Sequence, residues 1–192
     1  CICVSSKISS TYNSALNASQ MFPGREIVVI DSLNLCMGQG FMTLEAVNAA
    51  RRGADVNEII SCVTELNKRL HTYAALPTLK YLAMSGRVGK FVAGMADTFN
   101  IKPILTSQDG KLELLEKVRT QKNAVQRLID LTQMSLDGSS IERAAIVHVN
   151  NPEGALALEK QLRNSIPSFP DSVIIAEFTA GLSVHTGSGV VG

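Results

Sequence analysis

Short apolar strands alternate with helical segments over the first 70 residues, and this order restricts the fold more than any other feature. The segment EIVVID (26–31) is a continuous apolar run, which is typical of strands buried in a parallel sheet. Residues 2–4 form another expected strand, and helices are expected at 11–20, 41–52 and 56–70. Asp55 and Glu58 are an expected capping pair at the start of the last of these helices. This alternation predicts a parallel α/β layer.

The remainder of the chain has a different pattern. IKPILT (101–106) and KLELLEKV (111–118) are expected strands joined by SQDG, which is a hairpin signal. IIAEFT (174–179) and LSVHT (182–186) are expected to form an antiparallel pair. Other expected strands are 71–76 and 142–149, and expected helices are 76–84, 91–99, 121–133 and 154–165. Thr120 is the expected N-cap of the helix at 121–133.

Together these patterns predict a two-domain α/β protein. Residues 1–70 are the expected partial parallel α/β domain. Residues 71–192 are the expected α+β domain, with a mixed or antiparallel sheet flanked by helices. Because the sequence begins inside an expected strand, we expect an amino-terminal segment to precede it.

Charge and cysteine content narrow the function classes. The formal net charge is +1, which gives no electrostatic basis for binding nucleic acid. No apolar run approaches the roughly 18 residues of a membrane span, and we expect no signal peptide. The four cysteines include no C-x-x-C pair, so we expect free thiols, no metal site and a cytoplasmic protein.

A cluster of five hydroxyl side chains follows the first strand: Ser5, Ser6, Ser9, Ser10 and Thr11. One of them would suffice to cap the next helix. Hydroxyl donors beside a helix N-terminus could bind a carboxylate or a phosphate. The alternative is a polar loop with an ordinary helix cap, and the residues alone leave both interpretations open.

Other polar motifs offer weaker candidates. SGRVGK places Arg87 and Lys90 in a glycine-bracketed loop, which is either an anion-binding nest or a turn with solvated bases. With the other glycine-rich loops, it supports a phosphate or phosphosugar binder as one alternative function. Another alternative is a small serine hydrolase whose catalytic triad would be Ser9, His185 and Asp31, although no G-x-S-x-G elbow is present.

Six stretches, in order, resemble the DegV family of bacterial fatty-acid-binding proteins: SSKISSTYNSA, VIDSLNLCMGQGF, LKYLAMSGRVGK, NIKPIL, KVRTQKNAVQRL and VHTGSGVVG. The resemblance implies the EDD fold and one bound long-chain fatty acid. Its carboxylate would lie between two domains, and its acyl chain would be buried in the second.

The family resemblance also assigns roles to individual residues. It implies that Ser9 and Thr11 bind the carboxylate, together with Ser10, which replaces a usual glycine, and His185. Arg87, Arg119 and His185 are implied to lie near the phosphoryl group that a separate kinase transfers to the carboxylate. The family's further amino-terminal segment, which supplies another carboxylate-binding threonine, is not in this sequence.

The resemblance implies a lipid carrier rather than an enzyme. Such a carrier has no catalytic residue, metal or cofactor of its own, and its ligand is the fatty acid. Its expected partner is a fatty-acid kinase that converts the carboxylate to an acyl phosphate for phospholipid synthesis. A transient membrane contact is compatible with this role, and a nucleic-acid partner is not expected.

Overall fold

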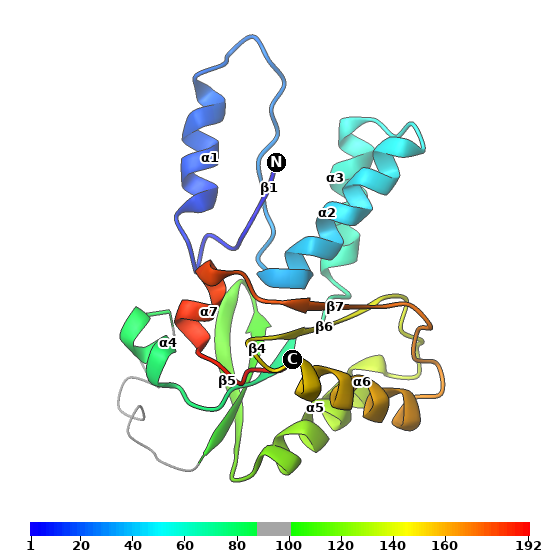
Figure 1. Ribbon diagram of the computed structural model, residues 1–192. Helices are drawn as coiled ribbons and strands as arrows, with labels where there is room; N and C mark the ends of the chain where they lie inside the picture. Colours follow the sequence, from blue (N-terminus) through cyan, green and yellow to red (C-terminus); the bar gives the residue numbers. More distant parts are fainter. Residues whose placement is uncertain (88–100) are drawn as a thin grey trace. The chain divides into compact units, whose positions relative to one another are not determined.

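The computed structural model describes residues 1–87 and 101–192 and divides the chain into two compact units. The first unit comprises Cys1–His71 with Ser107–Lys111, and the second comprises Thr72–Thr106 with Leu112–Gly192. Both contain helices and strands, so the predicted α/β class is confirmed (Figure 1). None of the helices in the described part is long and apolar enough to cross a membrane.

The first unit contains two short parallel strands and three helices. Strand β1 (Ile2–Cys3) pairs with β2 (Ile30–Asp31) in the register Ile2 to Ile30 and Cys3 to Asp31. Helices α1 (Thr11–Gln20) and α2 (Cys36–Arg51) both contact β1, and α3 (Val56–Asn67) packs against α2. The expected parallel layer is therefore present.

Two expectations for this unit are wrong. EIVVID is not a continuous buried strand, because only Ile30 and Asp31 join β2 and Ile27 is exposed. A two-residue pairing with β1 leaves most of the segment outside a sheet. Helix α2 also begins five residues before the expected start at 41, and so includes Gly38 and Gly40. The absent side chain of Gly38 allows this, since a Cβ there would lie 2.6 Å from Asn34 Oδ1.

The second unit is built on strands that the carboxy-terminal segment joins into one mixed sheet. Strands β3 (Tyr73–Ala75), β4 (Lys102–Gln108) and β5 (Lys111–Val118) are consecutive neighbours, with β3 antiparallel to β4. Strand β6 (Ala144–His148) is parallel to β7 (Val173–Glu177). Val191 forms antiparallel bridges to both Ala75 and His148, and so connects the two sets of strands.

Helices cover both faces of this sheet. Helices α5 (Gln121–Leu136) and α6 (Pro152–Ser165) lie side by side (Figure 1) and enclose the larger core with Ile104 and Val191. The adjacent residues Leu105 and Val190 point to the opposite face, where they pack with Leu76, Leu79, Leu82 and Val149 around α4 (Lys80–Ser85). We call this second set the aliphatic cluster.

The predicted strand LSVHT is wrong. Residues 180–186 form helix α7 (Ala180–Thr186), which packs against α4. The hydroxyl of Ser183 donates to the carbonyl oxygens of Phe178 and Thr179, and that of Thr186 donates to Leu182 O. Thr186 is the β-branched member of this pair, and a bond from its hydroxyl to the carbonyl four residues earlier is one that threonine makes within helices. The helix expected at 91–99 lies outside the described residues.

Candidate functional site

The loop between β1 and α1 carries the hydroxyl cluster, and buried Ser5 organises it. Ser5 O accepts hydrogen bonds from the backbone N–H groups of Ile8 and Ser9, each at 3.0 Å. Its side chain accepts from Lys7 N at 3.1 Å and donates to Gly110 O at 2.6 Å. Ser5 is fully buried, so its hydroxyl has a structural role that the sequence did not reveal.

The structure brings Ser9 and Thr11 together at the end of this loop. Their hydroxyl oxygens are 2.8 Å apart, and Thr11 N donates to Ser9 Oγ at 3.2 Å. Ser10 is exposed at the N-cap of α1, and its side chain makes no capping hydrogen bond. The cluster therefore presents an exposed pair of hydroxyl groups at the start of a ten-residue helix.

Asp31 supports the same loop from the end of β2. Its Oδ1 atom accepts from Ser6 N and Leu33 N, both at 3.1 Å. Neighbouring Ser32 and Asn34 are buried and bonded to each other, with Ser32 Oγ donating to Asn34 O at 3.0 Å. The bonded oxygen of Asp31 therefore holds backbone amides, which is a structural role rather than that of an acid in a hydrolase triad.

Two predicted residues of the second unit lie on or beside helices that pack together. Arg87 follows α4, is exposed, and donates to Ser85 O at 2.5 Å. His185 is half-buried on α7. The contact between these helices is close at Gly187, where a Cβ would lie 2.5 Å from the Tyr81 ring. Lys90, also predicted for the anion loop, lies outside the described residues.

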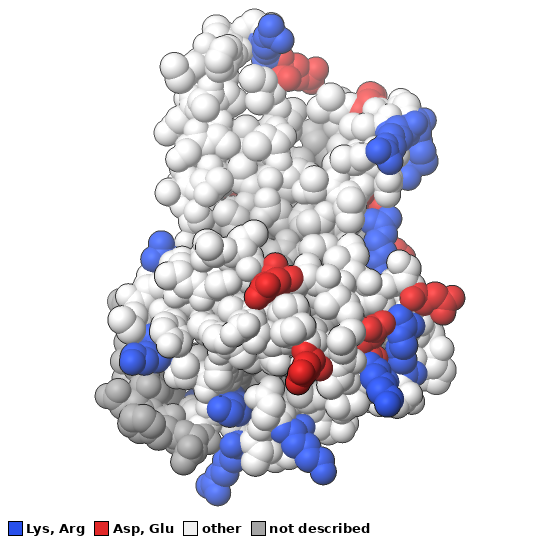
Figure 2. All heavy atoms as spheres, in the orientation of Figure 1, with Lys and Arg blue, Asp and Glu red and all other residues white. Residues whose placement is uncertain are grey.

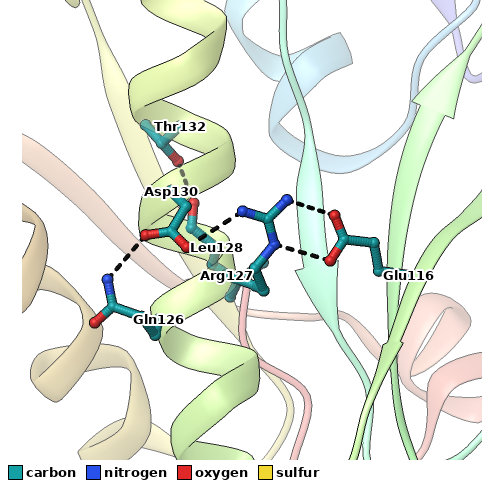
Figure 3. Close-up of polar contacts among 6 residues, drawn as sticks. All are labelled: Glu116, Gln126, Arg127, Leu128, Asp130 and Thr132. Atoms are coloured by element: carbon teal, nitrogen blue, oxygen red, sulfur yellow. Dashed lines mark hydrogen bonds and ion pairs between the residues drawn. The ribbon is translucent and has the colours of Figure 1, made fainter.

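Arg119 lies elsewhere in the second unit, in the exposed connection between β5 and α5. Thr120 caps α5 by accepting from Asn123 N at 3.1 Å, as expected. Figure 3 shows an ion-pair network that joins the two elements on either side of this connection. Arg127 Nε donates to Glu116 Oε2 at 2.8 Å, and its Nη1 donates to Asp130 Oδ2 at 3.2 Å.

This network perturbs the acidity of its members. The hydrogen bond from Arg127 lowers the pKa of Glu116, and the hydrogen bond from Gln126 is the main cause of a lowered pKa at Asp130. Both carboxylates in turn raise the pKa of Arg127. The network therefore holds fixed charges and ties the end of β5 to α5 beside Arg119.

On the face drawn in Figure 2, basic and acidic side chains occur in small groups of both signs. Among residues 1–87 and 101–192, no three His, Cys, Asp or Glu side chains are grouped to hold a metal ion. His148, which the sequence analysis did not select, is buried and accepts from Asn151 N at 3.3 Å through Nδ1.

Comparisons with known proteins agree with this architecture. A DegV-domain protein of Halalkalibacterium halodurans is 34% identical over 98% of this chain. The chain spans 66% of the length of that relative. Solved structures described as fatty-acid-binding DegV proteins are similar as well. Those from Thermus thermophilus and Bacillus subtilis each share 28% identity, with TM-scores of 0.89 and 0.86.

These two structures align with 98% and 99% of this chain, which covers 66% and 68% of theirs. The family model described as "Uncharacterised protein, DegV family" matches residues 1–192, which is the full sequence given. The chain therefore belongs to the DegV family.

Proposed function

We propose that this protein binds one long-chain fatty acid, with its carboxylate at Ser9 and Thr11 and its acyl chain in the second unit. The observation that carries the proposal is the exposed Ser9–Thr11 hydroxyl pair, 2.8 Å apart, in a chain similar to DegV proteins that bind fatty acids. The fatty acid is the ligand, and the proposal requires no metal or cofactor.

The acyl chain supplies most of the binding energy in this proposal. Burying a methylene contributes about 0.8 kcal/mol, so about fifteen methylenes contribute on the order of 12 kcal/mol before costs. Loss of ligand freedom and ordering of side chains offset a large part of this gain. The aliphatic cluster offers side chains of suitable chemistry, since its six buried members are all Leu or Val.

The hydroxyl groups provide selectivity for an acid. A buried or half-buried carboxylate without hydrogen-bond donors is strongly unfavourable, whereas a hydrogen bond to a charged group contributes about 1.5–3 kcal/mol. The helix dipole of α1 adds a smaller favourable contribution. A fatty acid is therefore expected to bind more tightly than the methyl ester with the same chain.

A direct test uses delipidated protein and isothermal titration with a long-chain fatty acid and its methyl ester. Ser9→Ala is expected to weaken binding of the acid by at least about tenfold, from the loss of one charge-assisted hydrogen bond, and to change ester binding less than about twofold. Ser14→Ala is the matched control, because Ser14 is an exposed serine on the same helix. Equal losses for acid and ester, or no binding by the parent, would contradict the proposal.

We also propose that the bound acid is presented in the cytoplasm to a separate fatty-acid kinase. The kinase would transfer the γ-phosphoryl group of ATP to a carboxylate oxygen, which forms acyl phosphate and ADP for phospholipid synthesis. Arg87, Arg119 and His185 would stabilise negative charge on the transferred group. Their exposed or half-buried positions support this role, and a transient membrane contact would serve delivery of the acid.

The kinase proposal is tested by measuring acyl phosphate formation with purified kinase and loaded protein. Arg119→Ala is expected to lower the rate at least about tenfold with unchanged fatty-acid affinity, because a charge that stabilises the transferred group is lost. Lys122→Ala is the control, because Lys122 is a nearby exposed base on α5. A native rate for Arg119→Ala would remove that residue from the proposal.

A further inference from the structure

The tip of the β4–β5 hairpin is held against the hydroxyl-bearing loop. Residues Ser107–Lys111 belong to the first unit, although most of both strands belongs to the second. Ser5 Oγ donates to Gly110 O at 2.6 Å in a buried bond. Gly110 has φ +79°, and a Cβ there would lie 2.5 Å from Ser5 Oγ and 3.0 Å from Leu33 Cδ2. The tip therefore fits against the loop with no spare space.

Ser107 belongs to the same short segment as Gly110. It precedes Gly110 by three positions, and three residues span at most about 10 Å. On the other side of the contact, Ser5 O accepts the hydrogen bond from Ser9 N at 3.0 Å. Ser5 thus links the hairpin tip to the loop that ends in Ser9 and Thr11.

The hydroxyl of Ser107 is buried and has no hydrogen-bond partner among the described residues. It is the one side-chain oxygen or nitrogen atom with this property in residues 1–87 and 101–192. Buried polar groups in folded proteins nearly always have a partner, because leaving one unsatisfied is destabilising. A buried free hydroxyl three positions from the residue that Ser5 binds is therefore informative.

A carboxylate at this loop needs more donors than the Ser9–Thr11 pair provides. A carboxylate offers about four acceptor positions, whereas each hydroxyl has one proton to donate. Ser9 and Thr11 are already bonded to each other at 2.8 Å, which uses one of their two protons. The pair therefore offers one proton to a ligand unless their mutual bond breaks.

We propose that Ser107 is a further ligand-binding residue, whose hydroxyl donates to the carboxylate that Ser9 and Thr11 bind. This inference rests on the proposed function and extends it to a residue of the hairpin. It makes an unusual prediction about stability. Removing an unsatisfied hydroxyl should not harm the ligand-free protein, whereas removing a bonded one should.

The test compares Ser107→Ala with Ser5→Ala in delipidated protein. Ser107→Ala is expected to keep or raise the melting temperature, and Ser5→Ala to lower it by several degrees. In titrations, Ser107→Ala should weaken binding of the long-chain fatty acid at least about fivefold and of its methyl ester less than about twofold. Ser107→Thr, which restores a hydroxyl, should recover most of the lost affinity.

Each alternative gives a distinct result. A melting temperature for Ser107→Ala as low as that of Ser5→Ala would mean that the hydroxyl has a structural partner, and would overturn the inference. Unchanged acid binding by Ser107→Ala, with weakened binding by Ser9→Ala, would also overturn it and leave the proposed function intact. Absence of acid binding by the parent would overturn both.

Discussion

Replacing Gly110 with alanine is expected to destabilise the protein by about 3 kcal/mol. Gly110 has φ +79°, and the left-handed conformation costs an L-residue about 1–2 kcal/mol. The new methyl group would also lie 2.5 Å from Ser5 Oγ. Ser5 cannot move aside freely, because it is fully buried and bonded on both sides. Losing its bond to Gly110 O adds about 1–3 kcal/mol.

Two controls separate these contributions in urea unfolding followed by far-ultraviolet circular dichroism. Gly138 has φ +81°, and a Cβ added there would meet no atom within 4 Å, so Gly138→Ala should show the backbone cost alone, about 1 kcal/mol. Ser5→Ala removes the atom that the new methyl group would meet. In a double-mutant cycle, Gly110→Ala should therefore cost at least about 1 kcal/mol less in the Ser5→Ala background.

The reasoning would be refuted by either of two results. If Gly110→Ala cost no more than Gly138→Ala, the close approach to Ser5 would be energetically unimportant. If Gly110→Ala and Ser5→Ala were strictly additive, the two residues would not interact. The inferred attachment of the hairpin tip to the loop would then have no support.

Three further predictions concern other parts of the chain. Arg127→Met should lower the free energy of unfolding by about 0.5–1 kcal/mol at pH 7. The effect is small because the ion pair with Glu116 is partly exposed and therefore screened by solvent. The lowered carboxyl pKa values stabilise the fold above the ordinary pKa values of Asp and Glu, and this stabilisation is lost as the pH falls below them. Urea titrations should therefore show the stability difference between Arg127→Met and the parent shrink in acid. Asp55→Ala removes a capping box with Glu58 and should cost about 1 kcal/mol in the same assay. Burial raises the pKa of Cys36, so its iodoacetamide alkylation, followed by mass spectrometry, should be slow at about pH 7.5 and still accelerate above about pH 9.

Local chemistry was predictable wherever its partners are close in sequence. Asp109–Gly110 between two apolar runs predicted the β4–β5 hairpin, and the structure places these residues at the turn. The spacing of Asp55 and Glu58 predicted the capping box, and Thr120 predicted the start of α5. In each case the bonded groups are close neighbours along the chain, so a short stretch contains the whole interaction.

Long-range arrangements were not predictable in this way. The Ser5–Gly110 bond joins residues 105 apart in the sequence, and neither residue type specifies such a partner. Val191 connects two sets of strands through single-residue bridges, which leave no periodic pattern. The helix α7 was missed because Val184 and Thr186 favour strands by propensity, whereas its packing against α4 is a tertiary contact that a short stretch of sequence does not contain.

The hydroxyl cluster shows why counting hydroxyl residues in a sequence overestimates the number of hydrogen-bond donors that are free to bind a ligand. Five hydroxyl residues lie between positions 5 and 11, but Ser5 donates its proton to Gly110 O. Ser9 and Thr11 share a bond that uses one more proton. A ligand carboxylate must therefore compete with bonds already present in the protein, and the free energy it gains is the difference between the new and the old bonds. A donor with no bond to lose contributes more to affinity than its neighbours, which is why one buried, unpartnered hydroxyl is a better candidate than several exposed ones.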